Sequence, residues 1–231
     1  MLETLLRIAQ HYPVTVHQLE MDGLPQLLAY QHSIDNYSET VDWMAFIDGD
    51  EFLFSPLHRD MEAALLAYDG VPLSALGVYW MCYGSNGHLN EPEGLILQNY
   101  PRHSSVNFPP NRHVKTILRG HEAAVANSSH LFVTRQGTFD ENLRPVTQGW
   151  MNSLEPTYQA LRINHYPIQS YQYFIGSKQT MGAADGDPHL TRSVDWYMEY
   201  DRNECDDGIS YNFLIPVKLK MQEIYAAILR E

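Results

Sequence analysis

The stretch WMAFIDGDEFLF, residues 43–54, places three carboxylates between two hydrophobic runs. Its first five residues form a short, continuous apolar run, which is typical of a strand buried in the middle of a parallel sheet. Asp48, Asp50 and Glu51 follow directly. Residues two apart in an extended chain share a face, so Asp48 and Asp50 are expected on one side, with Gly49 letting the backbone turn closely around a ligand.

Two carboxylates this close repel each other unless a cation lies between them. Oxygen ligands of this kind suit Mg²⁺ or Mn²⁺, which commonly take one or two carboxylates together with substrate phosphate oxygens. An isolated Asp-x-Asp is more often a solvated acidic turn. The apolar residues on both sides favour the cation site, because burial of uncompensated carboxylates is costly.

Length and composition predict one globular domain. The chain has 231 residues, of which 44% are hydrophobic, and no linker rich in Gly, Ser or Pro divides it. The formal charge of -13 disfavours binding to nucleic acid or to an anionic membrane surface. Cys82 and Cys205 form no CxxC pair, which favours a reducing cytoplasm over a disulfide framework or a zinc site. No apolar run is long enough to span a membrane, and no secretion signal is visible.

Hydrophobic periodicity predicts alternating helices and strands, and hence an α/β fold. The region 89–150 contains many prolines and is expected to consist mostly of loops and hairpins. Helices are expected over 2–12, 25–40, 58–68, 170–182 (with Ser170 as N-cap) and much of 193–231, where Gly208 and Pro216 interrupt; strands are expected over 14–21, 43–47, 75–83, 94–100, 113–119, 130–134 and 160–167.

The strand over 75–83 also delivers a polar loop, Gly84-Ser85-Asn86-Gly87-His88, from its carboxyl end. In an open α/β sheet the ligand crevice lies outside the carboxyl ends of the strands. This loop and the acidic turn are therefore expected to face one site.

Four stretches carry a family resemblance: DWMAFIDGDEFLF (42–54), YWMCYGSNGH (79–88), RINHYPIQSYQYFIGSKQTMG (162–182) and YDRNECDD (200–207). In this order they resemble nucleotide-sugar glycosyltransferases of the GT-A type, in the bacterial family-2-like group related to family 92. The resemblance implies a GT-A-like (Rossmann-like) mixed sheet flanked by helices, with an irregular β-rich middle and a helical C-terminus. Within one domain, about 1–88 would bind the nucleotide sugar and metal, and about 89–231 would bind the acceptor.

The resemblance implies metal-dependent transfer of a sugar from a nucleoside diphosphate sugar to a hydroxyl of a carbohydrate or glycan acceptor. Mn²⁺ or Mg²⁺ would be held by Asp50, the main ligand bridging to the diphosphate, and by His165 and Asp48, with Asp48 approaching either the metal or the ribose of the nucleotide sugar. His165 is also readily explained as an ordinary interior histidine. Lys178 would offset negative charge on the diphosphate, or else lie exposed on a helix face. Further positive charge could come from Lys115 or Arg119. Glu51 would support the metal ligands without contacting the ion itself.

On the acceptor side, Ser85, Asn86 and His88 could hydrogen-bond sugar hydroxyls, although this loop is also a good turn sequence. A transferase that inverts the anomeric centre needs a general base. Glu91 and Glu93 are candidates by position only, and either could as easily be surface charge.

One departure from the family pattern concerns the N-terminus. An Arg-Asn-Glu stretch and an Asp-x-x-Ser-x-Asp turn are expected before residue 43 and are not visible. The fold is therefore expected to lack roughly the first 40–60 family positions, about two βα units, and to expose sheet edges and apolar surface.

Two further functions stay open, the first because of this departure. The chain could be a non-catalytic or partner-dependent carbohydrate-binding remnant of such an enzyme. It could also be a metal-dependent hydrolase that uses Asp48, Asp50 and His165. The expected location is cytoplasmic, either free or peripheral to the membrane.

Overall fold

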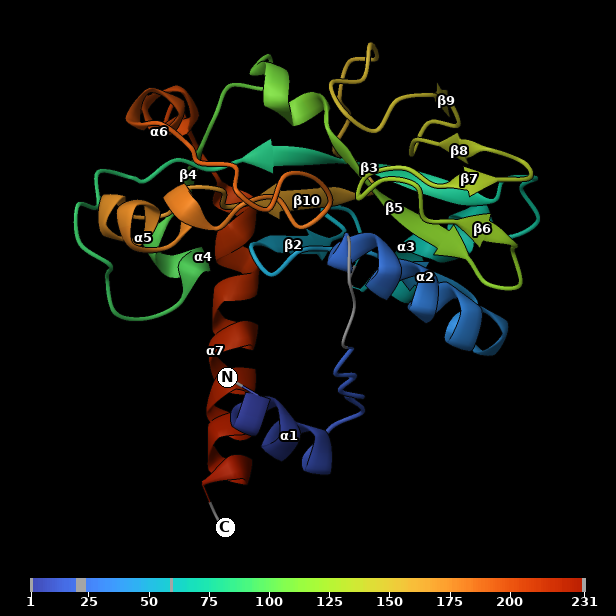
Figure 1. The fold of residues 1–231 in the computed structure, drawn as a ribbon, viewed down its shortest axis with the longest axis horizontal. Coiled ribbons are helices and arrows are strands. Elements are labelled where there is room, and N and C mark those ends of the chain that lie inside the picture. Colours follow the sequence, from blue (N-terminus) through green and yellow to red (C-terminus); the bar gives the residue numbers. More distant parts are fainter. Residues whose placement is uncertain (1, 20–23, 59, 230–231) are drawn as a thin grey trace.

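The centre of the fold is the fully buried strand β3, Ala75–Cys82 (Figure 1). The computed structural model describes residues 2–19, 24–58 and 60–229. Side chains at even positions of β3, such as Leu76, Val78 and Trp80, join the main hydrophobic cluster, while Tyr79 and Met81 join two smaller clusters. Both faces of β3 are therefore covered, which explains why its sequence is continuously apolar instead of alternating.

The main sheet is mixed, which confirms the predicted α/β class. Its strands lie in the order β1 (Trp43–Ala45), β5 (Val114–Arg119), β3, β10 (Arg162–His165) and β2 (Glu51–Phe54). β10 runs parallel to β3, whereas β5 is antiparallel to β3 and β1, and β2 is antiparallel to β10. β8 (Thr138–Phe139) adds a short parallel pairing to β3 and continues into β9 (Pro145–Val146).

The run 43–47 does not lie in the middle of a parallel sheet as expected. Only Trp43–Ala45 form a strand, and this strand lies at one edge of the sheet, antiparallel to β5. The apolar character of the run comes from side-chain packing: Phe46 is buried and contacts the ring of Phe132 at a centroid distance of 4.7 Å. Because β1 and β2 lie at opposite edges, residues 46–50 carry the chain from one edge to the other.

The helical segments lie outside this sheet, and polar side chains cap some of them at their N-termini. The helical segments are α1 (Leu2–His11), α2 (Pro25–Tyr37), η1 (Ser38–Thr40), α3 (Met61–Leu65), η2 (Leu66–Tyr68), α4 (Ile96–Asn99), η3 (Pro109–Arg112), α5 (Tyr171–Gly176), η4 (Lys178–Thr180), α6 (Val194–Tyr200) and α7 (Gly208–Ile228). The Ser170 side chain accepts a hydrogen bond from the Tyr173 backbone N–H, which confirms the predicted N-cap of α5.

Two predicted strands and one predicted helix interruption were wrong. Residues 14–19 form no strand; residues 20 and 21, which complete that prediction, lie outside the described residues. The segment 94–100 contains the helix α4; Leu97 within it and Tyr100, which follows its last residue, are both buried in one cluster. Pro216 lies inside α7 and does not interrupt it. Pro216 is exposed, so the helix carbonyl that loses its backbone donor can be hydrated.

The middle of the chain is irregular, as predicted. β4 (Arg102–His103) pairs with β11 (Cys205–Asp206), and β6 (Ala124–Val125) pairs with β7 (Val133–Thr134). The predicted strand over 130–134 is therefore limited to its last two residues.

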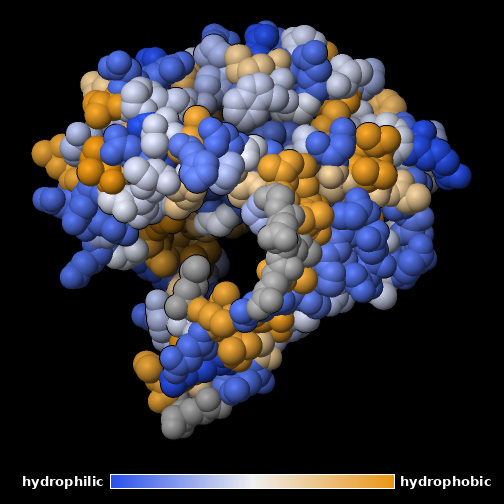
Figure 2. Space-filling view, viewed as in Figure 1, coloured by the Kyte–Doolittle hydropathy of each residue, from blue (hydrophilic) through white to orange (hydrophobic). Residues whose placement is uncertain are grey.

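The helix α7 extends away from the sheet, with α1 alongside it (Figure 1). The Tyr12 hydroxyl donates to Glu223, and the Lys220 ammonium lies 4.8 Å from the centre of the Tyr12 ring. Hydrophobic residues gather over this extension (Figure 2). The exposed apolar side chains of α1 and α7 include Leu2, Leu5, Leu6, Ile215 and Leu219. In the described parts of the chain, no helix combines the length and the apolar character needed to cross a membrane.

Candidate functional site

A cavity of about 1120 Å³ opens beside the acidic turn. Its lining includes Asp48, Gly49 and Asp50 from the turn, Trp80 from β3 and His165 from β10. The turn reaches this position because residues 46–50 pass from one sheet edge to the other, with Tyr166 N–H donating to the Asp50 carbonyl. The acidic motif and two neighbouring strands therefore meet at one concave surface.

Asp48 is held by a lysine and by helix α2. Its Oδ2 accepts a hydrogen bond of 2.8 Å from the Lys115 ammonium, which is only 1% exposed. Its Oδ1 accepts hydrogen bonds from the Gln26 side chain and, at 3.1 Å, from the Tyr30 hydroxyl. Both carboxylate oxygens are thus satisfied by the protein.

Asp50 turns to the other side of the site. Its Oδ2 lies 2.7 Å from the Lys178 ammonium and 4.0 Å from His165 Nε2. Burial favours the neutral acid, but the interactions with His165 in its protonated form and with the Lys178 ammonium outweigh it, so the pKa of Asp50 lies below its usual range. Near neutral pH, where the His165 ring is uncharged, Lys178 supplies the positive charge. Asp50 is therefore ionised near neutral pH, with Lys178 as its direct partner.

Glu51 points inward and supports the turn from behind. Its Oε2 accepts the Asp48 backbone N–H at 2.8 Å, and its Oε1 lies 3.8 Å from Lys115 Nζ. Burial raises the pKa of this carboxyl to about 8, against the opposing effect of Lys115. Glu51 thus fixes the backbone of the turn and is shielded from the cavity.

His165 is a neutral imidazole at the cavity wall. Burial lowers its pKa to about 3, and Asp50 only partly opposes this effect. Its ring lies 4.0 Å from the Trp80 ring, centre to centre, and its Nδ1 lies 4.0 Å from Cys82 Sγ. A neutral ring leaves a nitrogen lone pair available to bind a cation.

Asp50 and His165 fit a divalent cation better than Asp48 does. Two ligands of one ion, each at about 2.2 Å, can be up to ~4.4 Å apart, and Asp50 Oδ2 and His165 Nε2 meet this limit. Asp48 already accepts protein hydrogen bonds at both oxygens. Within the described ranges, no three His, Cys, Asp or Glu side chains form a group that could hold a metal ion. The three-ligand site therefore stays a prediction.

The predicted acceptor loop is held by other parts of the protein. The backbone N–H of Ser85 donates to Asp201 at 2.7 Å, and that of Asn86 donates to Asn203 at 2.8 Å. The ring of His88 bonds the Asn99 carbonyl at 2.9 Å. Ser85, Asn86 and His88 are not among the described residues that line the cavity. Their role in binding an acceptor stays a prediction.

Glu91 and Glu93, the predicted general-base candidates, are exposed and are likewise absent from the described cavity lining. The Glu91 backbone N–H donates to Gln172 at 2.8 Å, and the Glu93 carbonyl accepts from Asn99 at 3.0 Å. The structure therefore gives neither carboxylate a position beside Asp50.

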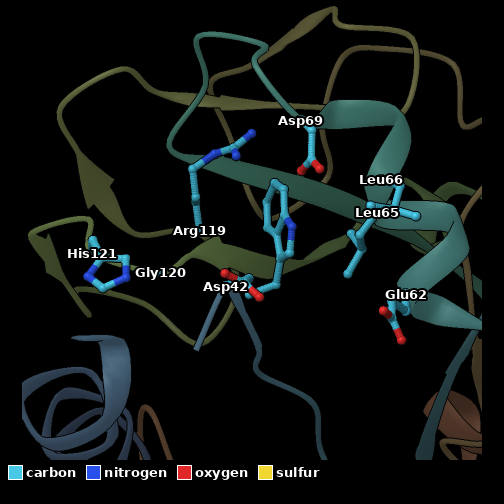
Figure 3. Close-up of a pocket in the computed structure, with 9 residues that line it drawn as sticks. Asp42, Glu62, Leu65, Leu66, Asp69, Arg119, Gly120 and His121 are labelled. Carbon is cyan, nitrogen blue, oxygen red and sulfur yellow. The ribbon is translucent and has the colours of Figure 1, made fainter. Parts of the chain in front are cut away.

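Arg119 lies in a different cavity, of about 540 Å³, shown in Figure 3. Its guanidinium donates to the backbone carbonyls of Tyr68 at 2.7 Å and Leu73 at 3.2 Å, and covers the Trp43 ring at 4.4 Å. These bonds tie β5 to the loop before β3. Of the two suggested sources of extra positive charge, only Lys115 reaches the acidic turn.

Sequence reasoning missed an aromatic and polar part of the cavity. It is lined by Trp150, His130 and Ser129, and by the segment 182–193, where the Ser129 hydroxyl donates to Asp185 and the Gln26 backbone N–H donates to the Ala184 carbonyl at 3.3 Å. The tryptophan in the stretch Gln148-Gly149-Trp150-Met151-Asn152 was the available signal. That signal could not show that Trp150 lines the cavity, because its position there depends on contacts with residues far away in the sequence.

His113, which packs behind this wall, predicts a pH dependence of stability. Burial lowers its pKa to about 4, from 6.5 for an unperturbed histidine. Between these pH values the unfolded chain binds a proton that the folded chain does not, so the free energy of unfolding decreases as the pH falls, by up to about 3 kcal/mol. Urea denaturation at about pH 7 and about pH 5 should show a larger decrease for the native protein than for His113→Gln. Equal decreases would contradict this.

Comparison with models of known protein families gives no match. Comparison with curated proteins also gives no match.

Proposed function

We propose that this chain is a glycosyltransferase of the GT-A type, which transfers a sugar from a nucleoside diphosphate sugar to a carbohydrate hydroxyl. The observation that carries the proposal is the cavity, in which an Asp-Gly-Asp turn lies beside a lysine, a neutral histidine and several aromatic rings. Trp80 comes from one resembling stretch, 79–88, and His165 and Lys178 come from another, 162–182; all three line this one cavity together with the acidic turn. Asp201, from the remaining stretch, anchors the loop after β3.

Lys178 is the residue best placed to bind the diphosphate. It lines the cavity and its side chain is 14% exposed, so its ammonium can turn from Asp50 to a phosphate oxygen without a large change of solvation. Arg192, whose guanidinium donates to the Lys178 carbonyl at 3.1 Å, lies in the same lining. In a protein of charge -13, this local positive charge is what an anionic ligand requires.

A divalent cation fits this scheme, with Asp50 and His165 as the residues that would hold it. When bound, Mn²⁺ or Mg²⁺ supplies positive charge that stabilises the departing diphosphate. Asp48, tied to Lys115 and α2, orients the turn. Glu51 keeps the backbone of the turn fixed.

A carbohydrate-binding protein without turnover is the second candidate. One observation favours it: Asp48 and Asp50 each have a lysine within 2.8 Å, so the turn is already neutralised without a metal ion. A site of this kind would bind a sugar and would not bind nucleotides.

Calorimetric titration separates the two functions. UDP and GDP are titrated into the protein with and without Mn²⁺. For a transferase, one nucleotide should bind, and its affinity should rise at least about tenfold with Mn²⁺, a difference of ~1.4 kcal/mol. Absence of binding by both nucleotides in a folded sample would overturn the transferase and leave the second candidate.

A further inference from the structure

Trp150 is an exposed tryptophan beside the cavity. It has an exposed fraction of 61% and lines the cavity together with Trp80 and Asp50. Tryptophan is usually highly buried in folded proteins. An indole left open at the wall of a ligand cavity therefore calls for an explanation.

The backbone that carries Trp150 is fixed on both sides. The Gly149 carbonyl accepts a hydrogen bond of 3.0 Å from the Val114 N–H, and the Asn152 N–H donates to the Arg112 carbonyl, also at 3.0 Å. Both anchors belong to the start of β5 and the turn before it. Trp150 thus projects from a rigid support, so little backbone freedom remains to be lost when a ligand binds.

The indole ring is also held in orientation. The His113 ring meets it edge-on at a centroid distance of 3.9 Å and an angle of 85°, and the His130 ring lies at 5.2 Å. His113 itself is fixed by a 2.6 Å hydrogen bond to the Pro110 carbonyl. At Gly149 a side-chain Cβ would lie 2.5 Å from His130 Cβ, so only glycine allows this close approach. The ring is therefore pre-oriented.

The surroundings of Trp150 suit a neutral polar ligand. Burial lowers the pKa of His130, so its ring is uncharged at neutral pH. The Ser129 hydroxyl and Asp185 carboxylate add hydrogen-bonding groups, and Asp185 would repel an anion. Among the described residues of the lining, the lysine and arginine side chains are Lys178 and Arg192, both from the segment after α5.

A sugar ring matches this combination. The C–H bonds on one face of a pyranose can pack on the negative face of an indole, while its hydroxyls reach polar groups at the ring edge. The path from Asp50 to Trp150 runs through ring contacts of His165, Trp80 and His113. Three aromatic rings thus separate a ligand on Trp150 from Asp50, beside which the diphosphate is proposed to bind.

We propose that Trp150 is the stacking platform of a subsite that binds a pyranose ring of the acceptor carbohydrate, with His130, Ser129 and Asp185 bonding its hydroxyls. The acceptor role rests on the proposed function. Binding of the sugar itself does not, because the same platform would serve a carbohydrate-binding protein without turnover.

Saturation-transfer NMR tests this proposal with methyl glycosides of glucose, galactose, mannose and N-acetylglucosamine as probes. At least one glycoside should receive saturation, mainly at the C–H protons of one ring face. Trp150→Ala should weaken this binding by at least about tenfold, or ~1.4 kcal/mol, whereas Trp150→Phe should keep part of it. Tyr211→Ala, which removes an exposed aromatic side chain from α7, is the matched control and should have no effect.

Two results would overturn the proposal: no saturation of any glycoside, or equal glycoside binding by Trp150→Ala and the native protein. In the second case, a loss of UDP binding in Trp150→Ala would assign the ring to a nucleobase. Glycoside binding that depends on Trp150 in a protein that binds neither UDP nor GDP would support the subsite while overturning the transferase.

Discussion

Replacing Lys115 by methionine is expected to lower the free energy of unfolding by about 3 kcal/mol, although methionine has a similar volume. The Lys115 ammonium is 1% exposed and lies 2.8 Å from Asp48 Oδ2 and 3.8 Å from Glu51 Oε1. Its removal leaves two carboxyl groups at the base of the turn without their cation. Urea denaturation of the native protein and Lys115→Met measures the difference.

A double-mutant cycle separates this charge effect from a packing effect. Asp48→Asn removes the carboxylate that lies 2.8 Å from the Lys115 ammonium. If electrostatics dominates, the double variant should be more stable than the sum of the single effects predicts, by at least about 1 kcal/mol. Lys220→Met, on the exposed surface of α7, is the matched control and should change stability little. Strict additivity, or an equal loss in the control, would contradict the proposed role of Lys115.

The fold was predictable where local pattern and final environment agree. The strand β3 is continuously apolar because both of its faces are covered, and the Ser170 cap acts within one helical turn. The position of β1 was not predictable in this way. Its apolar run resembles a central strand, but the burial comes from side chains such as Phe46 that pack on α2 and the β6–β7 hairpin. Sequence shows that a residue is buried without showing which element covers it.

The acidic turn illustrates the same limit for the site. The expectation that Asp48 and Asp50 share one cation assumes an extended backbone. In the structure the Glu51 N–H donates to the Asp48 carbonyl at 3.1 Å, so the chain turns at this point. The two carboxylates then reach different lysines, Lys115 and Lys178, from distant parts of the sequence.

The surroundings of Trp150 were beyond sequence reasoning for a related reason. Nothing in the local pattern places residue 150 beside His113 and His130, because the contact depends on the hydrogen bond between Val114 N–H and the Gly149 carbonyl. The tryptophan and the histidines were visible in the sequence. Only the tertiary structure shows that their rings lie together.

Asp50→Asn should reduce the affinity for the nucleotide in the presence of Mn²⁺ by about 100-fold, or ~2.7 kcal/mol, while leaving the fold intact. The substitution keeps the size of the side chain and its ability to accept from Lys178, but it removes the charge that would hold a cation beside His165. Calorimetric titration of UDP and GDP measures the loss. Asp42→Asn, which lines the other cavity, is the matched control and should bind as the native protein does.

Lys178→Met, measured by the same titrations, tests whether the Lys178 ammonium competes with a cation and binds the diphosphate. The Lys178 ammonium now lies 2.7 Å from Asp50, where it would compete with a cation and assist a diphosphate. If both effects operate, the variant should bind Mn²⁺ alone more tightly than the native protein and bind the nucleotide about tenfold more weakly. Unchanged nucleotide affinity in Asp50→Asn together with unchanged Mn²⁺ affinity in Lys178→Met would mean that the Asp50–Lys178 pair is structural, and that this cavity binds its ligand through the aromatic wall.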